Sequence, residues 1–262
     1  MKIVFDIPSL IPYVNWPYFY YAWQVKGEQE KIRLRTEAEV FLMKIENRYQ
    51  AYALFELFAA NADGDDIVLD EHRIPLLRQQ QGKPPYLCLS DFLRPITSGI
   101  KDRVGVFATS VDLGLETDFD FDPYQKMMAQ LLADRLAEAA AECMHEQVRK
   151  KYWGYAKDEQ LSIPDMLIEK FQGIRPAIGY PSLPDTSLNF VLNDLLDLRQ
   201  IGIRLTESGA MKPHASVSGL MLAHPKACYF NLGKIGEDQL RDYARRRGLP
   251  IEVVRKFLAS NL

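Results

Sequence analysis

The sequence has only three cysteines in 262 residues, Cys88, Cys143 and Cys228, and no two of them form a Cys-x-x-Cys pair. This spacing excludes a radical iron–sulfur motif, and it fits reduced cytosolic thiols better than the disulfide framework of a secreted protein. We therefore expect a fold that is stabilised by its hydrophobic core and needs neither a disulfide nor a metal cross-link.

The sequence also lacks a large excess of charge and any long apolar run. Its formal charge is −3, whereas a general binder of nucleic acid or of an anionic membrane needs a clear cationic excess. The arginines at 245–247 end a predicted helix just before Gly248, where cations complement the helix dipole. No apolar run reaches the ~20 residues of a spanning helix, and Asp6 and Pro8 interrupt the region where a signal peptide would be apolar. These absences predict a cytoplasmic protein with no nucleic-acid and no membrane partner.

The common cofactor and catalytic signatures are missing as well. There is no Gly-x-Gly-x-x-Gly and no Gly-x-x-x-x-Gly-Lys, which argues against nucleotide binding by a Rossmann or P-loop domain. The four histidines have no zinc spacing, and none forms an evident pair with a serine or cysteine nucleophile: His72, His145, His214 and His224. We therefore predict no metal site and no catalytic residue, which disfavours a hydrolase or a zinc enzyme.

The patterns that are present predict one domain spanning residues 1–262, with strands and helices mixed. Hydrophobic residues make up 47% of the chain, and no repeat, low-complexity tract or linker divides it. We expect strands at 2–7, 52–60, 66–70, 76–81, 86–92, 103–110, 216–223 and 228–232. We expect helices at 28–50, 123–152, 164–171, 188–200, 237–247 and 250–258. Segments 52–60 and 66–70 should form a hairpin with its turn at Asp63-Gly64, and 216–223 should pair with 228–232 around His224-Pro225.

The segment from Gly173 to Pro181 is predicted to be a stiff loop that presents side chains. Its two prolines restrict the backbone, and Gly179 lets the chain approach a ligand closely. Arg175 offers a fork of donors suited to a carboxylate, and Tyr180 offers an aromatic ring with a hydroxyl group. The alternative is a rigid connector whose arginine lies in solvent.

A row of carboxylates marks the predicted long helix. Acidic residues recur at four-residue spacing and so lie on one helix face: Asp134, Glu138, Glu142 and Glu146. They form either a solvated face or a wall for a cationic ligand. Combined with Arg175, Tyr180 and Tyr229, a wall at Glu138 would suit a zwitterion that carries an extra positive charge.

The chain resembles the C-terminal activation domain of cobalamin-dependent methionine synthase over nearly its whole length. The later blocks of the resemblance are Asp134-Arg-Leu-Ala-Glu-Ala139, His145-Glu146, Val148-Arg-Lys150, Tyr152-Trp-Gly-Tyr-Ala156, Gly173-Ile-Arg-Pro-Ala177, Gly179-Tyr-Pro181, Leu205-Thr-Glu-Ser208, Ala215-Ser-Val-Ser-Gly219, His224-Pro225 and Asp242-Tyr-Ala-Arg-Arg246. The earlier blocks are Gly64-Asp-Asp66, Leu77-Arg-Gln-Gln80, Asp91-Phe92 and Gly105-Val-Phe-Ala108. The resemblance implies an α+β, C-shaped domain with a bent, largely antiparallel sheet and surrounding helices.

The resemblance also implies a function. The family's domain binds S-adenosylmethionine and supports the reductive methylation of cob(II)alamin to methylcobalamin, with an electron from flavodoxin or another reductase. Its ligand contacts correspond here to Asn15, Glu138, Arg175, Pro176, Ala177, Gly179, Tyr180, Tyr229 and Phe230. Arg175 should bind the methionyl carboxylate, and Glu138 should favour the positive groups. Asn15 departs from the family, which typically has aspartate before Trp16, and this loss of charge predicts weaker binding.

The modules that bind homocysteine, folate and cobalamin in methionine synthase are not found in this sequence. The chain is therefore either an excised fragment or a free-standing activation subunit that meets a cobalamin-binding module of methionine synthase in trans. We expect the free-standing subunit, because Met1 is followed by a predicted strand and the chain finishes shortly after the last predicted helix. Such a subunit would not make methionine alone. Two alternatives are an S-adenosylmethionine-binding sensor that no longer meets a corrin, and an independent methyltransferase acting on another small molecule.

Overall fold

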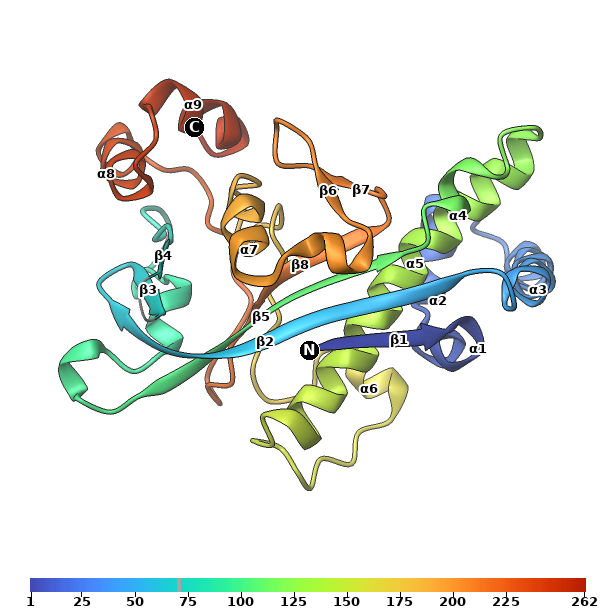
Figure 1. Ribbon diagram of the computed structural model, residues 1–262, viewed down its shortest axis with the longest axis horizontal. Helices are drawn as coiled ribbons and strands as arrows, with labels where there is room; N and C mark the ends of the chain where they lie inside the picture. The colour runs from blue at the N-terminus through green and yellow to red at the C-terminus, as the bar shows by residue number, and fades with distance from the viewer. Residues whose placement is uncertain (70–71) are drawn as a thin grey trace.

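The computed structural model describes residues 1–69 and 72–262, and its framework is an antiparallel sheet (Figure 1). The strands run in the order β4-β3-β2-β5-β8, and β1 pairs with the free side of β2. Their bounds are β1 Lys2–Asp6, β2 Gln50–Asp63, β3 Asp66–Leu69, β4 His72–Pro75, β5 Asp102–Val111 and β8 Ser216–Met221. A separate two-stranded sheet consists of β6 Arg204–Leu205 and β7 Met211–Lys212.

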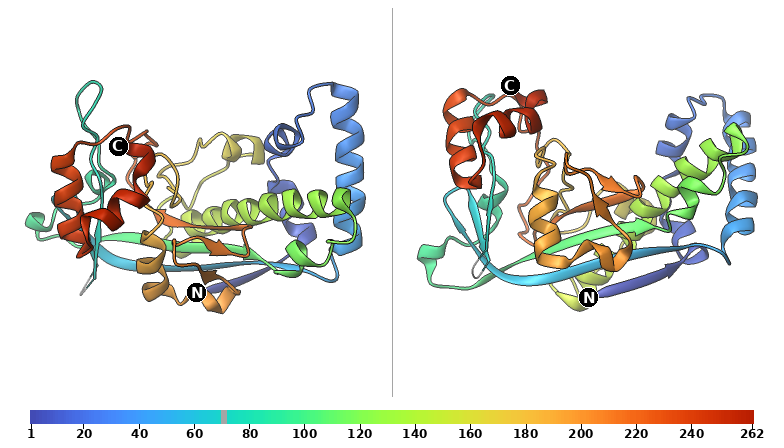
Figure 2. Two further views of the ribbon diagram at one scale, coloured as in Figure 1. Left: turned by 90° about the horizontal axis from the view of Figure 1, so that it is seen from above. Right: turned by 45° about the horizontal axis from the view of Figure 1, so that its top comes forward.

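Helices surround this sheet. Their bounds are α1 Ile7–Leu10, α2 Trp16–Ala22, α3 Glu28–Ile45, α4 Gly114–Thr117, α5 Pro123–Gln147, α6 Ile163–Leu167, α7 Leu188–Leu196, α8 Glu237–Arg247 and α9 Ile251–Phe257. Helix α3 stands at one end of the sheet and α8 with α9 at the other, all on the same side, so the molecule is C-shaped (Figure 2). None of the helices in the described part of the chain combines the length and apolar character that crossing a membrane requires.

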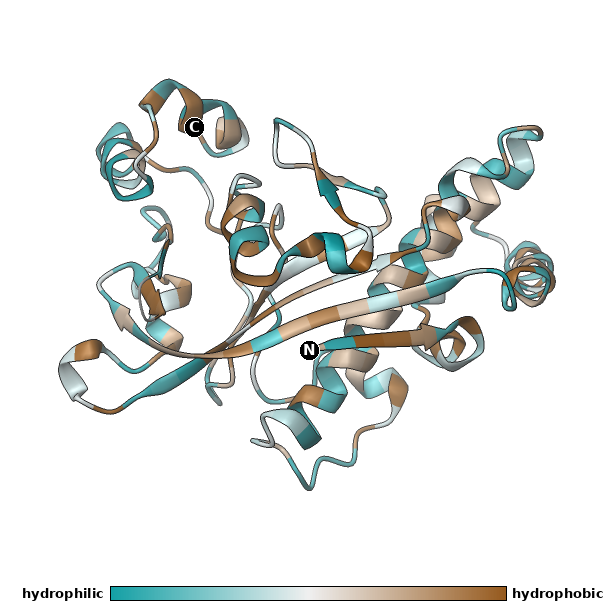
Figure 3. Cartoon of the chain, in the orientation of Figure 1, coloured by the Kyte–Doolittle hydropathy of each residue, from teal (hydrophilic) through white to brown (hydrophobic). Residues whose placement is uncertain are grey.

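The bend of the sheet comes from its longest strand. Residues 51–60 of β2 pair with β5, and residues 61–63 then pair with β3, so β2 joins the central strands to the β3–β4 hairpin. Hydrophobic residues lie within β1 and along the middle of β2 (Figure 3), and α5 packs against β2 and β5. The predicted hairpin is confirmed, although its turn is Gly64-Asp65, one residue later than expected. Strand β3 ends at Leu69, and the predicted last residue, Asp70, lies outside the described residues.

Helix α5 begins where the sequence predicts. The Asp122 side chain accepts hydrogen bonds from the backbone N–H groups of Tyr124 and Gln125, and Pro123 occupies the first turn, where its missing N–H costs nothing. The alanines at 137 and 139–141 are buried, and their small size allows α5 to lie close to the sheet. The helix continues as a π-helical segment, Val148–Tyr152, so the predicted end at 152 is confirmed.

Three predicted strands are wrong. Segment 76–81 makes only an isolated bridge, 86–92 contains a short 3₁₀ turn, and 228–232 has no regular structure. Their apolar side chains serve other contacts, since Leu77 and Leu232 pack with Leu240 of α8 in a separate hydrophobic cluster. A short apolar run does not distinguish a strand from an irregular segment that is buried beneath a helix.

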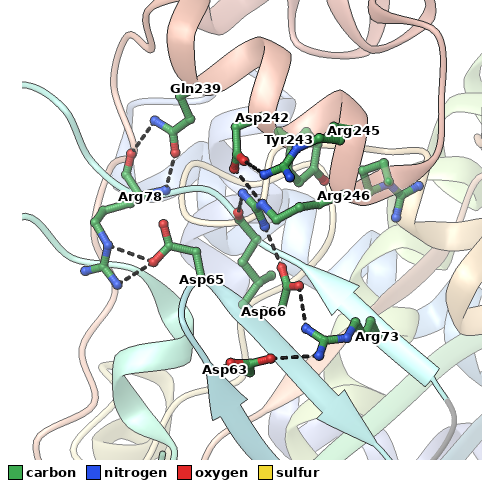
Figure 4. Close-up of polar contacts among 12 residues, drawn as sticks. Asp63, Asp65, Asp66, Arg73, Arg78, Gln239, Asp242, Tyr243, Arg245 and Arg246 are labelled. Atoms are coloured by element: carbon green, nitrogen blue, oxygen red, sulfur yellow. Dashed lines mark hydrogen bonds and ion pairs between the residues drawn. The ribbon is translucent and has the colours of Figure 1, made fainter.

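The C-terminal helices are attached to the β3–β4 hairpin by a polar network (Figure 4). Arg246 of α8 donates to Asp66 at 2.5 Å, to Asp242 at 2.7 Å and to the carbonyl of Leu76 at 3.0 Å. The Gln239 side chain exchanges two hydrogen bonds with the backbone of Arg78, at 2.6 and 2.8 Å. The arginines near the end of α8 therefore make contacts within the protein.

Candidate functional site

A cavity of about 570 Å³ lies between α5 and the segment 175–182. This volume is within the usual range for a small-molecule site. The residues that line the cavity are Tyr13, Asn15, Tyr18, Arg135, Glu138, Glu142, Leu167, Glu169, Arg175, Pro176, Ala177, Tyr180, Pro181, Ser182, Tyr229, Phe230 and Asn231. They come from five separate stretches of the chain, so only the folded protein forms this cavity.

The segment from Gly173 to Pro181 is held against the free edge of β8. Ile174 exchanges backbone hydrogen bonds with Leu222 at 2.9 and 3.0 Å, Leu220 donates to Pro176 at 3.0 Å, and Ile178 donates to Ser218 at 2.8 Å. Gly173 has φ +83°, and an added Cβ would lie 2.4 Å from the carbonyl oxygen of Leu222. The segment is therefore fixed to the sheet, as the sequence predicted for a stiff loop.

Arg175 is buried in the cavity wall, with 8% of its surface exposed. Its Nη2 donates to Oε1 of Glu142, and its backbone N–H donates to the hydroxyl of Tyr229 at 2.9 Å. Burial alone would lower the pKa of Arg175, but the Glu142 carboxylate keeps that pKa above its usual value. The alternative of a connector with its arginine in solvent is wrong.

The carboxylate row on α5 is not a fully solvated face. Glu138 and Glu142 line the cavity, and both are partly buried. The hydroxyl of Tyr180 donates to Oε1 of Glu138 at 3.1 Å, and the pKa of Tyr180 is raised to about 12, chiefly by the Glu138 charge and then by burial. Tyr180 is 53% exposed, so this pair lies near the mouth of the cavity and Arg175 lies deeper.

Asn15 lies at the start of α2 and lines the same cavity. Its side-chain oxygen accepts a hydrogen bond from the N–H of Tyr18 at 3.4 Å, so the residue caps the helix. Asparagine and aspartate cap helices about equally well, so an aspartate at position 15 would cap α2 just as Asn15 does.

The structure brings eight of the nine predicted site residues together around the cavity: Asn15, Glu138, Arg175, Pro176, Ala177, Tyr180, Tyr229 and Phe230. The ninth, Gly179, is not in the lining. It has φ +88° and donates from its backbone N–H to Leu183 at 2.8 Å, so its place in the fold is a turn that carries Tyr180. Contact of any of these residues with a ligand remains a prediction.

Sequence reasoning missed Glu169 and gave Glu142 no specific role. Glu169, with φ +60°, lies just beyond α6, and the pKa of Glu169 is raised by burial and then by the nearby Glu142. Glu142 could have been found, because it lies one helical turn from Glu138 and so shares its face. No local pattern marked Glu169.

The charged groups lining the cavity carry a small negative excess. Three glutamates, Glu138, Glu142 and Glu169, face two arginines, Arg135 and Arg175, which leaves a formal charge of −1. Among residues 1–69 and 72–262, no group of three or more histidine, cysteine, aspartate or glutamate side chains is placed to hold a metal ion. The arrangement can therefore bind a carboxylate at Arg175 and one or more cationic groups at the glutamates.

Comparison with known proteins assigns the family. Residues 6–248 match the family described as "Vitamin B12 dependent methionine synthase, activation domain". The chain belongs to this family. It is also similar to a solved structure titled "Crystal Structure of the MetH Reactivation Domain bound to AdoHcy", with 37% sequence identity and a TM-score of 0.96. That likeness covers 100% of this chain and 90% of the other.

The family assignment confirms the resemblance and the fold class inferred from the sequence. The activation domain belongs to a cobalamin-dependent methyltransferase, so the enzymatic context of this chain is vitamin B12-dependent methionine synthesis. The bent antiparallel sheet and its helices match the reactivation domain over the whole chain.

Proposed function

We propose that this chain binds S-adenosylmethionine in the cavity between α5 and the Gly173 to Pro181 segment, and that it delivers the methyl group to cobalamin on a partner module of methionine synthase. The observation that carries the proposal is the buried pairing of Arg175 with Glu142 in a cavity whose lining is net negative. The family membership and the similar domain bound to AdoHcy, the demethylated form of this ligand, support it.

Charge favours S-adenosylmethionine over its demethylated product. The methyl donor has a carboxylate, an ammonium and a sulfonium, for a net charge of +1, whereas AdoHcy is a neutral zwitterion. The cavity lining has a formal charge of −1, so the sulfonium compensates the glutamate that the two arginines leave unpaired. The site is therefore expected to bind the methyl donor more tightly than the product.

Different site residues are assigned to different groups of the ligand. Arg175 binds the methionyl carboxylate, and Glu138 favours the sulfonium. Tyr180, Tyr229 and Phe230 shape the cavity and its opening, while Pro176 and Ala177 contribute the adjoining wall. Asn15 contacts the ligand from α2. Gly179 acts indirectly through the turn that carries Tyr180.

The chain does not carry out methyl transfer alone in this proposal. A cobalamin on the partner module, reduced by one electron from flavodoxin or another reductase, would supply the cobalt nucleophile. The carbon–sulfur bond of the sulfonium would break with its electron pair left on sulfur, giving AdoHcy, and the methyl group would pass to cobalt. The half-exposed ring of Tyr180 and the partly exposed ring of Tyr229 give this chain a surface near the cavity that a flat macrocycle can meet.

A reconstitution experiment tests the function. The purified chain is added to a methionine synthase that lacks its own activation domain, together with cob(II)alamin, S-adenosylmethionine and a chemical reductant. Methylcobalamin, followed by its absorbance, should form only when this chain is present. Arg175→Ala should abolish the effect, and Arg33→Ala, an exposed substitution on α3, serves as the matched control. Binding of S-adenosylmethionine without methylation would instead favour a sensor, and no binding would refute the proposal.

A further inference from the structure

The ion pair between Arg175 and Glu142 lies in the cavity lining and leaves part of its hydrogen-bonding capacity unused. Only Nη2 of Arg175 and Oε1 of Glu142 meet. The other oxygen of Glu142 and Nε of Arg175 are both enclosed, and neither has a hydrogen-bond partner within the protein. Leaving buried polar atoms unpaired is costly, and because both residues line the cavity, a ligand bound there can supply the missing partners.

The two unpaired atoms require partners of opposite kinds. Nε of Arg175 is a donor and needs an acceptor, whereas Oε2 of Glu142 is an acceptor and needs a donor. A carboxylate and an ammonium joined to one carbon supply both at the spacing of adjacent groups. The end of an α-amino acid therefore fits this pair better than a lone carboxylate does.

The charges around the Arg175–Glu142 pair also favour a ligand with an ammonium group. Arg175 is the one cationic side chain found within 4.0 Å of Glu142 among the described residues. Glu169 also lies close by, because the Glu142 charge contributes to raising the pKa of Glu169 and the Arg175 charge lowers it. Two carboxylates thus lie near one guanidinium in the cavity lining, only one of them paired with it, and a ligand ammonium would balance the excess.

The helix fixes where the rest of the ligand lies. Glu138 and Glu142 are on successive turns of α5, so their Cα atoms are separated by about 6 Å along the axis. In the methyl donor, the sulfonium is separated from the α-carbon by two methylene groups. A ligand lying along α5 with its amino-acid end at Glu142 therefore places its sulfur near Glu138 and the cavity mouth.

We propose that Glu142 and Arg175 together form a clamp for the α-amino acid end of the ligand, in which Glu142 both positions the guanidinium and accepts the ligand ammonium. This inference rests on the proposed function, because it assigns an orientation to the ligand in the same cavity. It makes Glu142 a determinant of specificity for ligands with an amino-acid end over nucleosides without one.

The test compares two ligands that differ only at that end. AdoHcy and 5′-methylthioadenosine share the nucleoside and the thioether, but the second lacks the ammonium and the carboxylate. Binding of each is measured by isothermal titration calorimetry to the wild type, Glu142→Gln and Glu142→Asp. Glu146→Gln is the matched control, since Glu146 lies one turn further along α5, pairs with Tyr13 and Lys150, and does not line the cavity.

We expect Glu142→Gln to weaken AdoHcy binding by about tenfold to a hundredfold, the range for loss of a charge-assisted hydrogen bond, and to leave methylthioadenosine binding unchanged. Glu142→Asp should recover part of the loss, and Glu146→Gln should behave as the wild type. Circular dichroism establishes that each variant is folded, and the aspartate variant carries the test if the glutamine variant is not.

The outcomes separate this inference from the proposed function. If the wild type binds neither S-adenosylmethionine nor AdoHcy, the proposed function fails. If the wild type binds AdoHcy but Glu142→Gln binds it equally well, or loses both ligands to the same extent, the clamp is overturned and the proposed function stands.

Discussion

Replacing Gly219 with alanine should displace the segment that carries Arg175. Gly219 lies in β8 opposite Phe107 of β5, and the segment crosses its other side. An ideal Cβ at Gly219 would lie 2.1 Å from the carbonyl oxygen of Pro176 and 2.9 Å from Cα of Ala177. Because Cβ atoms essentially never approach other atoms within 3.0 Å, the backbone of the segment must retreat by about 1 Å.

The cost follows from the contacts that this movement strains. The hydrogen bonds from Leu220 to Pro176 and from Ile178 to Ser218 hold the segment at this point, and each contributes about 0.5–1.5 kcal/mol. Overpacking adds about 1–3 kcal/mol, so we expect Gly219→Ala to lower the free energy of unfolding by about 2–6 kcal/mol. Displacement of Arg175 should also weaken AdoHcy binding by about tenfold or more.

Urea denaturation and calorimetric titration with AdoHcy measure these two effects. Gly27→Ala is the control, because Gly27 has an ordinary φ of −74° and its added Cβ would meet only the flexible end of Glu30, at 3.1 Å. We expect this control to lose at most about 1 kcal/mol and to bind AdoHcy normally. If Gly219→Ala matches Gly27→Ala in both measurements, the segment is not held as the structure indicates.

Three further predictions concern the cavity and the helix beside it. Asn15→Asp should tighten S-adenosylmethionine binding by about fivefold to tenfold in calorimetry, because aspartate preserves the α2 cap and adds a charge to the lining; no gain would remove Asn15 from the site. Glu138→Gln should weaken S-adenosylmethionine binding by about tenfold and AdoHcy binding less, and equal losses would place the sulfonium elsewhere. Burial, with the charges of Arg149 and Arg175, lowers the pKa of His145 well below 6.5, so below pH 6.5 the unfolded chain takes up a proton that the folded chain does not. The wild type should therefore lose about 1 kcal/mol more unfolding free energy than His145→Leu between pH 6.5 and 5.5 in urea titrations, and equal losses would contradict a buried neutral His145.

Much of the fold could be predicted because local signals agree with tertiary packing. Asp122-Pro123 predicts the start of α5, and Gly248 follows the end of α8, because these residues satisfy or replace backbone groups at helix ends. Strand β5 was predicted from its apolar run at 103–110, and the structure buries that run in the sheet along most of its length. The errors at 76–81, 86–92 and 228–232 fall where apolar residues pack beneath helices or loops, which sequence periodicity does not reveal.

The sequence predicted part of the candidate site, and the structure added the rest. The chemistry of Arg175, Tyr180 and Glu138 could be inferred from the sequence, because a stiff loop and a regular helix determine locally which side chains share a face. The sequence did not show which turn of α5 meets the guanidinium. The structure pairs Arg175 with Glu142 and pairs Tyr180 with Glu138.

The sequence by itself determined the start of α5, both ends of α8, the central strands, the shared face of the carboxylates and the resemblance to the activation domain. The predicted ends of the helices at 28–50, 164–171 and 188–200 were wrong, because α3, α6 and α7 end at Ile45, Leu167 and Leu196. Only the tertiary structure decided that the 173–181 segment joins the edge of β8, that Glu142 meets Arg175, and that Glu169 enters the same cavity. The physical reason is that helix caps and periodicity depend on residues a few positions apart. An ion pair across a cavity depends on the rotation of a helix and the placement of a loop, which contacts throughout the core determine together.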